Sequence, residues 1–281
     1  AIAEVDPHYW VIWGPTTTLL GVISALAWGL GYFGQPHIIV RFMAIRSPRE
    51  AVAGGTIGIG WMLFAVLGAA GTAIVGVATY QHDKKQLADP ETVFITLGKL
   101  LFHPLVAGFM LAAILAAIMS TISSQLLVTS SALIEDLYGS FARTREEKIS
   151  GNRMVLYSRM AVFAIALVAA VMAWNPSKTI LALVAFAWAG FGAGFGPTTL
   201  LALWWRRLTT AGAASGMIVG AALVFLWDHL GDTLGGVFTL YELLPGFVAN
   251  LVVAIVVSLL THRPNPAIDA EFSRAVELTR G

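Results

Sequence analysis

Seven long apolar segments follow one another along this chain and leave few residues between them. A helix needs about 20 residues to cross the hydrocarbon core of a bilayer, and each segment comes close to that length or exceeds it. We therefore expect an all-α integral membrane protein with about seven transmembrane helices. The segments cover residues 16–44, 51–80, 104–138, 153–174, 179–204, 211–228 and 238–261.

The composition supports a lipid environment. Only 12% of the residues are charged and 57% are hydrophobic, whereas a soluble domain has about 25% and 45–50%. So few charges argue against a soluble enzyme and a disordered chain, and the net charge of +1 argues against a nucleic-acid partner. The absence of cysteine excludes disulfides, thiolate metal sites and cysteine nucleophiles.

Lys and Arg residues gather in every second connection between the segments. Such residues mark the cytoplasmic side of a membrane protein. Twelve of them would lie on one side and four on the other, and this predicts an external N-terminus and a cytoplasmic C-terminus. The twelve are Arg41, Arg46, Arg49, Arg143, Arg145, Lys148, Arg153, Arg206, Arg207, Arg263, Arg274 and Arg280, and the four are Lys84, Lys85, Lys99 and Lys178.

Two stretches outside the segments predict surface elements. Residues 90–102 indicate a short surface helix, with Asp89 as its N-cap and Pro90 at its first position. We assign residues 1–262 to a transmembrane domain and residues 263–281 to a polar cytoplasmic tail, which either frays or forms a short surface helix.

The first segment contains the run WGLGYFGQP at residues 28–36, with three glycines and a proline in nine residues. Glycine and proline disfavour a helix interior by about 1 and 3 kcal/mol, and a helix broken in mid-membrane is typical of a transporter binding site. Trp28 and Tyr32 would share one face if the helix persisted. The alternative is a glycine-rich packing face with a proline kink.

The third segment places small and hydroxyl residues on one helical face. Ala117, Ser120, Thr121 and Ser124 have the spacing i, i+3, i+4 and i+7. Two hydroxyls and a backbone carbonyl are hard oxygen ligands, and neutral ones suit a monovalent ion such as Na⁺. Ordinary helix packing through small residues is the competing interpretation.

Two further segments are rich in glycine. Residues 188–197 read WAGFGAGFGP and indicate a helix that bends as a gate, with Gly190 and Gly192 at its centre, or one that packs closely. Gly212, Gly216 and Gly220 recur every four residues and indicate a helix-contact face.

Ionisable residues are scarce inside the segments. Arg41 follows the break in the first segment, either as a residue that reaches the membrane surface or as a functional group near the cytoplasmic opening. Glu135 and Asp136 lie at the end of the third segment. Because a proton relay needs buried carboxylates or histidines, Na⁺ coupling is favoured over proton coupling. The sequence contains none of the hydrolase, metalloprotease or nucleotide-binding motifs that would indicate an enzyme.

At these residues the sequence resembles the sodium:solute symporter family. The likeness covers about residues 20–262 and rests on long motifs in a fixed order. The motifs are WGLGYFGQPHII at 28–39, AILAAIMST at 113–121, QLLV at 125–128, EDLY at 135–138, AWAGFG at 187–192 and PGF at 245–247.

The resemblance implies a fold of two inverted five-helix repeats, with substrate and Na⁺ bound beside broken helices. Trp28, Tyr32 and Pro36 fall on positions that the family links to proline binding, and Gln35 and Arg41 match motif positions. Ala117 would supply a carbonyl to Na⁺, and Ser120 and Thr121 would supply hydroxyls. The implied activity is Na⁺-coupled symport of L-proline across a bacterial plasma membrane.

The family's first helices have no counterpart in this sequence, so we expect the C-terminal part of a larger core, with the N-terminal helices missing. Three alternatives stay open. The substrate is another small carboxylate, such as pantothenate or another amino acid; the chain is a transporter-like signalling receptor; or it is an inactive scaffold.

Overall fold

The computed structural model describes residues 11, 14, 17–82, 87, 89–134, 151–174 and 179–280, and within these ranges the regular elements are all helices. The chain divides into two compact units. One contains Arg49–Asn175, and the other contains Thr16–Pro48 and Pro176–Gly281. The expected all-α class is confirmed.

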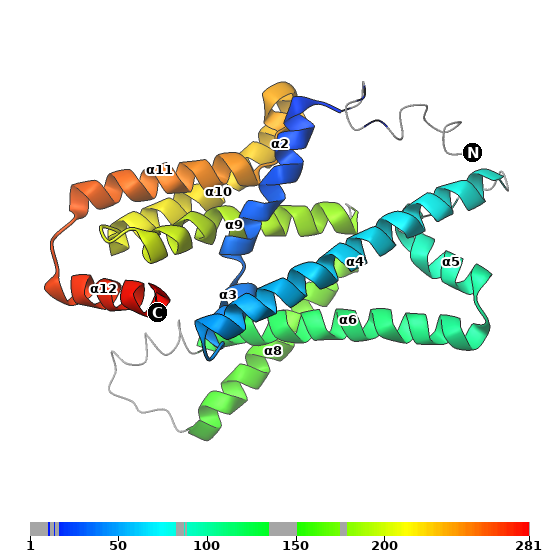
Figure 1. Ribbon diagram of the computed structural model, residues 1–281, viewed down its shortest axis with the longest axis horizontal. Helices are drawn as coiled ribbons and strands as arrows, with labels where there is room; N and C mark the ends of the chain where they lie inside the picture. Colours follow the sequence, from blue (N-terminus) through cyan, green and yellow to red (C-terminus); the bar gives the residue numbers. More distant parts are fainter. Residues whose placement is uncertain are drawn as a thin grey trace. The chain divides into compact units, whose positions relative to one another are not determined.

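The first unit is built around three long helices (Figure 1). A 3-10 turn and a short helix connect the first two of them. The Asp89 carboxylate accepts a hydrogen bond from the Glu91 amide at 3.0 Å, and Pro90 occupies the first helical position, as predicted. The elements are α4 (Pro48–His82), η2 (Pro90–Thr92), α5 (Val93–Leu101), α6 (Pro104–Ser131) and α8 (Gly151–Ala173).

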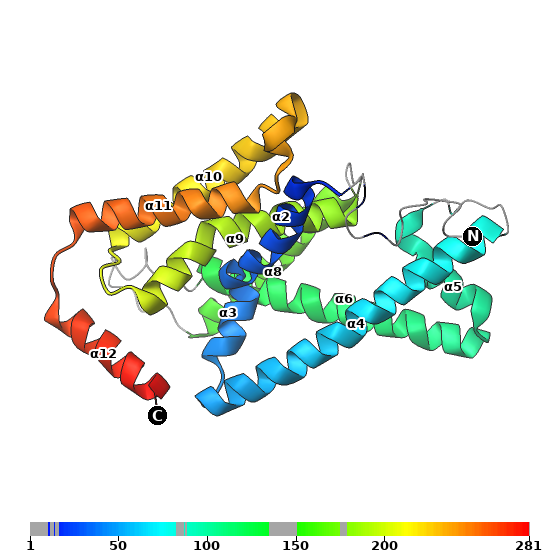
Figure 2. The same cartoon turned by 45° about the horizontal axis from the view of Figure 1, so that its top comes forward.

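The second unit combines a broken helix with three long helices that lie side by side (Figures 1 and 2). The broken helix consists of α2 (Leu19–Ala27), η1 (Trp28–Gly34) and α3 (Pro36–Met43). The remaining elements are α9 (Ile180–Trp204), α10 (Thr210–Leu234), η4 (Gly236–Thr239), α11 (Leu243–Thr261) and α12 (Pro266–Arg280).

Close packing of α10 against α11 depends on the three regularly spaced glycines. A Cβ atom on Gly216 would lie 2.8 Å from Ala254 Cβ, and one on Gly212 would lie 2.7 Å from the Ala254 carbonyl oxygen. Such separations are too short for nonbonded carbon contacts, so only glycine allows this approach. The predicted helix-contact face is confirmed.

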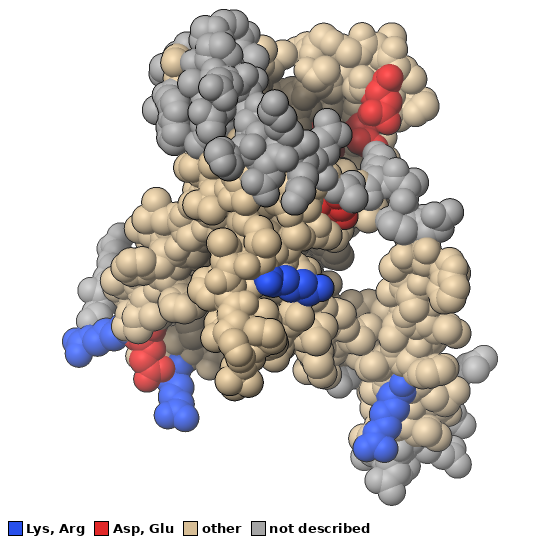
Figure 3. All heavy atoms as spheres, turned by 90° about the vertical axis from the view of Figure 1, so that its right-hand side faces the viewer, with Lys and Arg blue, Asp and Glu red and all other residues tan. Residues whose placement is uncertain are grey.

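In the described part of the chain, six helices are long and apolar enough to cross a membrane, by length and composition. They match the second to seventh predicted segments; the first segment does not form a single span because it is interrupted at residue 28. On the face drawn in Figure 3, the described surface is mostly uncharged, with isolated Lys, Arg, Asp and Glu side chains. Hydrophobic side chains without charged neighbours suit contact with lipid.

The ends of two predicted features can be compared with the structure. The third segment was expected to reach residue 138; its apolar helix extends through Ile134, and the rest of the segment, with Glu135 and Asp136, lies outside the described residues. The polar tail forms α12, in line with the expected short helix. The membrane orientation and the inverted-repeat topology stay predictions.

Candidate functional site

The α-helix of the first segment gives way to a 3-10 helix at Trp28 and ends at Gln35, which has extended backbone angles of φ −83° and ψ 112°. Pro36 then opens α3 at its first position. Proline has no N–H group and disfavours a helical conformation in the preceding residue. The predicted break therefore occurs, and Gly31 and Gly34 of this run pack against α9. A binding site at the break stays a prediction.

An aromatic cluster surrounds the start of the break. The Trp28 ring stacks on Tyr241 with centroids 5.4 Å apart, and on Trp188 with centroids 6.3 Å apart. The Tyr32 ring meets Trp188 edge-on, with centroids 4.9 Å apart. Trp28 and Tyr32, expected on one face, thus both contact the same indole ring of α9.

Hydrogen bonds tie the broken helix to α9 at two points. The indole N–H of Trp188 donates to the Trp28 carbonyl oxygen at 3.0 Å. The side-chain amide of Gln35 donates to the Trp188 carbonyl oxygen at 3.2 Å. One residue of α9 is therefore connected to both ends of η1.

Tyr241, in the connection between η4 and α11, also belongs to this cluster. Its hydroxyl donates to the Ala185 carbonyl oxygen at 2.7 Å, and its backbone N–H donates to the Ser24 hydroxyl at 2.9 Å. Burial, and to a smaller degree the neighbouring Glu242 carboxylate, raise the pKa of the Tyr241 phenol. The phenol therefore stays protonated at neutral pH and keeps its donor hydrogen.

The two glycines proposed for gating have different surroundings. A Cβ atom on Gly192 would lie 2.8 Å from the Cα atom of Gly31 and 2.6 Å from a methyl carbon of Leu243. A Cβ atom on Gly190 would meet nothing within 4 Å. Gly192 is thus required for the approach of η1 to α9, whereas Gly190 is not.

The predicted substrate residues differ in accessibility. Tyr32 is 47% exposed and Gln35 is 3% exposed, while Trp28 and Pro36 are half-buried. The Tyr32 ring can therefore meet a ligand directly, whereas the Gln35 amide is engaged with Trp188. Aromatic faces beside a helix break suit a small ligand with an apolar body and charged ends.

The predicted ion ligands lie together on α6, in the first unit. The Thr121 hydroxyl donates to the Ala117 carbonyl oxygen at 3.1 Å, and the Ser124 hydroxyl donates to the Ser120 carbonyl oxygen at 2.9 Å. Ala117, Ser120 and Thr121 are all exposed. A hydroxyl that donates its hydrogen keeps oxygen lone pairs for a cation, so this face retains ligand capacity.

Arg41 lies in the last turn of α3 and is exposed. A positive charge there is favourable beside the negative end of the helix dipole. Among the described residues, no group of three or more His, Asp and Glu side chains is placed to hold a metal ion. Any ion bound by these residues would depend on carbonyl and hydroxyl oxygens.

Asn250 of α11 was not anticipated from the sequence. Pro197 lies inside α9 and cannot donate to the Ala193 carbonyl four residues earlier. The fully buried side-chain amide of Asn250 donates to that carbonyl and to the Gly194 carbonyl, both at 2.7 Å. The amide thus satisfies backbone acceptors in the turn that precedes Pro197.

Sequence reasoning also left Trp188 and Tyr241 out of the site. Trp188 opens a glycine-rich run that resembles the run after Trp28. Two such runs favour close packing of their helices against each other. This likeness is the sequence signal that could have identified Trp188. Tyr241 and Asn250 have no local signal, because their partners lie 56 and 57 residues away in α9.

Comparison with known proteins gives a consistent result. Residues 14–220 match the model of the sodium:solute symporter family. The chain is 52% identical over 272 residues to the high-affinity proline transporter PutP of Bacillus subtilis (strain 168), covering 97% of this chain and 56% of that protein. It is 47% identical over 270 residues to a sodium/proline symporter of Staphylococcus aureus, covering 94% and 52%.

The chain therefore spans about half the length of the curated relatives it matches. Their names are those of transporters, in agreement with the expectation that the chain is not an enzyme. No solved structure gives a significant match.

Proposed function

Because the chain belongs to the sodium:solute symporter family, we propose that it takes part in Na⁺-coupled symport of L-proline. The observation that carries this proposal is the aromatic cluster at the helix break, where Trp28 and Tyr32 both meet Trp188. The names of its relatives, a proline transporter and a sodium/proline symporter, support the same substrate.

The chemistry of proline suits this site. Its pyrrolidine ring is apolar and compact, and its ring nitrogen carries a positive charge that an aromatic face attracts. The half-exposed ring of Tyr32 and the ring of Trp28 would hold this part of the molecule. Pro36 would shape the break, and the N-terminal end of α3 would favour the carboxylate. Gln35 would act mainly by holding η1 against α9.

Sodium would bind to oxygen atoms of α6. The Ala117 carbonyl and the hydroxyls of Ser120 and Thr121 would be three of its ligands, since all lie on one exposed face of the helix. Hard cations take six or more oxygen ligands in the best-known sites, so further ligands would come from other helices, as the family resemblance implies.

Coupling would follow from reciprocal binding. If Na⁺ raises the affinity for proline, proline raises the affinity for Na⁺ by the same factor. Na⁺ would stabilise an outward-facing state, proline would then bind, and movement of the helix bundle would expose both to the cytoplasm. Arg41, Gly190 and Gly192 are the proposed gating or coupling residues, and the membrane is the bacterial plasma membrane with the C-terminus in the cytoplasm.

The test is uptake of labelled L-proline into proteoliposomes that contain the protein encoded by the complete open reading frame. We expect uptake that requires an inward Na⁺ gradient. Excess unlabelled proline should abolish it, and excess pantothenate or other amino acids should not. Uptake that is insensitive to Na⁺, or proline binding without any uptake, would contradict the proposal and favour a receptor.

A further inference from the structure

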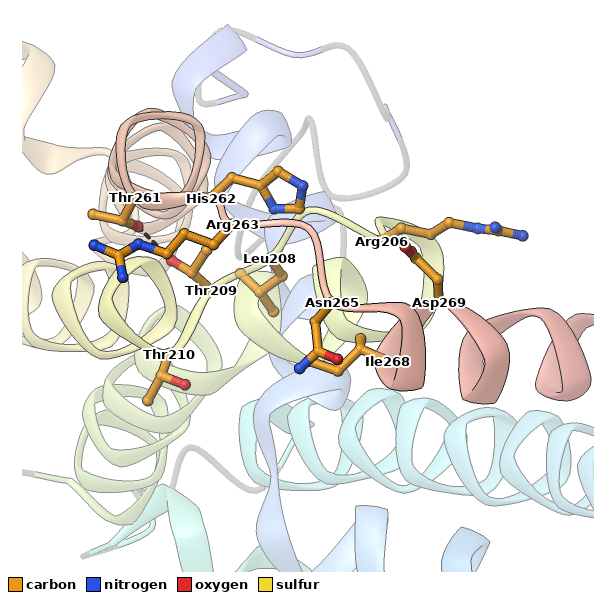
Figure 4. A pocket seen from close by; sticks show the side chains of 10 residues that line it. All are labelled: Arg206, Leu208, Thr209, Thr210, Thr261, His262, Arg263, Asn265, Ile268 and Asp269. Carbon is orange, nitrogen blue, oxygen red and sulfur yellow. Dashed lines mark hydrogen bonds between the residues drawn. The ribbon is translucent and has the colours of Figure 1, made fainter.

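The two ends of the long helices in the second unit make different contacts. At one end a pocket of about 230 Å³ lies where α9 and α11 finish and α10 begins. The Thr209 and Thr261 hydroxyls form a hydrogen bond of 2.7 Å there, and the side chains of Arg206 and Arg263 point to opposite sides (Figure 4). That end joins the long helices to one another. The opposite end, where α10 connects to α11, reaches the broken helix instead.

Tyr241 makes this contact with the broken helix, and three hydrogen bonds fix its position. Its N–H donates to the Ser24 hydroxyl of α2 at 2.9 Å, and its phenol donates to the Ala185 carbonyl oxygen of α9 at 2.7 Å. Its carbonyl oxygen accepts from the Leu244 N–H, in the first turn of α11, at 3.0 Å. The residue is buried, with 9% of its surface exposed. Tyr241 is therefore held by three helices at once.

These bonds lie beside the turn that leads into the helix break. Ser24 and Trp28 are four residues apart, so they lie on one side of α2, and Tyr241 contacts both. The rings of Tyr241 and Trp28 are 5.4 Å apart between centroids and only 16° from parallel. On α9, Ala185 lies one turn before Trp188, whose ring also stacks on Trp28. The Trp28 ring is thus stacked on two rings that are themselves fixed by hydrogen bonds.

We propose that Tyr241 is a positioning residue for the transported substrate and acts by holding the Trp28 ring in one place. This inference rests on the proposed function, in which Trp28 contacts proline. A side chain that is already held in place loses little freedom when the substrate binds, so its preorganisation favours binding. A wall in a fixed position also distinguishes ring sizes, because one additional methylene in a pocket changes binding about 10–200-fold. Tyr241 thereby contributes to the affinity for a five-membered ring and to the rejection of a six-membered one.

The test is uptake of labelled L-proline into proteoliposomes that contain the protein encoded by the complete open reading frame, with pipecolic acid as the six-membered competitor. We expect Y241L to raise the KM for proline about fivefold and to leave kcat within about twofold, because it weakens binding and not the transport step. The ratio of the inhibition constant of pipecolic acid to the KM for proline should fall about threefold. Y241F keeps the stacked ring and loses only the bond to Ala185, so its KM should rise about twofold.

Two further variants separate positioning from a loss of stability. F238L is the matched control, because Phe238 is an aromatic residue of the same connection and packs on Trp227 of α10, with centroids 4.8 Å apart. It should lower the melting temperature and leave both the KM and the preference for proline unchanged. In a W28A background, Y241L should raise the KM no further, because the ring that Tyr241 holds is then absent.

The failure of this inference can be distinguished from that of the proposed function. An unchanged KM in Y241L, equal changes in Y241L and F238L, or additive effects of W28A and Y241L would overturn the role of Tyr241 and leave Na⁺-driven proline uptake standing. If Y241L is not recovered as a folded protein, an unchanged KM in Y241F would overturn that role. Absence of Na⁺-driven proline uptake by the unmodified protein would overturn the proposed function and this inference with it.

Discussion

The side-chain amide of Asn250 lies 2.7 Å from the Ala193 carbonyl oxygen, the acceptor that Pro197 leaves without its helical donor. The two residues belong to different helices, α11 and α9, so a side chain of one helix completes the backbone of the other. An unsatisfied backbone carbonyl in an apolar interior is costly. We therefore expect the loss of stability caused by a substitution of Asn250 to depend on whether residue 197 is proline.

Replacement of Asn250 by alanine should lower stability by about 1–3 kcal/mol, because it leaves a buried carbonyl without a donor. The loss should be smaller in a P197A background, because residue 197 then regains an N–H group that can donate to Ala193. Thermal unfolding of the four members of this double-mutant cycle in detergent measures the coupling. S258A removes a different buried hydrogen bond of α11, to the Thr209 amide, and should be additive with P197A. Additivity of N250A with P197A would contradict the assignment.

The two glycines proposed for gating should respond in opposite ways to alanine. G192A should lower stability by about 1–3 kcal/mol, because the new methyl group meets the Gly31 backbone, which can recede only if η1 moves. G190A should be neutral or should stabilise by up to about 1 kcal/mol, since its surroundings are open and alanine favours helix. Melting temperatures of the two variants measure the difference, and equal values would show that the η1–α9 approach is not tight.

Substitution of Trp188 should raise the KM for proline, and not only lower the stability of the fold. W188F removes the indole N–H that bonds the Trp28 carbonyl, and we expect the KM for proline to rise about fivefold through loss of roughly 1 kcal/mol. W227F is the matched control, because Trp227 also donates an indole N–H to a backbone carbonyl, that of Leu240, at 3.0 Å. W227F should lower stability to a similar degree and leave KM unchanged. A parallel change of KM in both variants would remove Trp188 from the site.

Thr121 and Thr129 allow a test of the ion site within one helix. Each hydroxyl donates to the carbonyl four residues earlier, at 3.1 and 2.8 Å, so alanine at either position removes the same local bond. T121A should raise the Na⁺ concentration for half-maximal proline uptake about tenfold, and T129A should leave it unchanged. Unaltered Na⁺ dependence in T121A would refute the assignment of this residue as a ligand.

The extents of the helices could largely be predicted from the sequence. The apolar segment 179–204 corresponds to α9 at Ile180–Trp204, and segment 153–174 corresponds to α8 at Gly151–Ala173. An uninterrupted apolar run has one stable conformation in lipid, because a helix satisfies its own backbone. The predicted end of the sixth segment at residue 228 was too early, because α10 continues to Leu234. The apolar run ends near Asp228, but the helix continues through the polar residues Asp228 and Asp232.

The contacts between helices could not be predicted in the same way. The break at residues 28–36 was visible because glycine and proline act locally. Its partner Trp188 lies 160 residues from Trp28, and its choice depends on how α9 packs against η1. The sequence therefore predicts Trp28 as a residue of the substrate site, whereas its partner Trp188 is identified only by the three-dimensional structure.

The contact between Asn250 and α9 has a mechanical consequence. An amide–carbonyl hydrogen bond in an apolar medium is worth about 4–6 kcal/mol, and any sliding of α11 along α9 would break the two that Asn250 makes to Ala193 and Gly194. We therefore expect these two helices to move as one body, together with η1, which Trp188 and Gln35 fasten to the same helix.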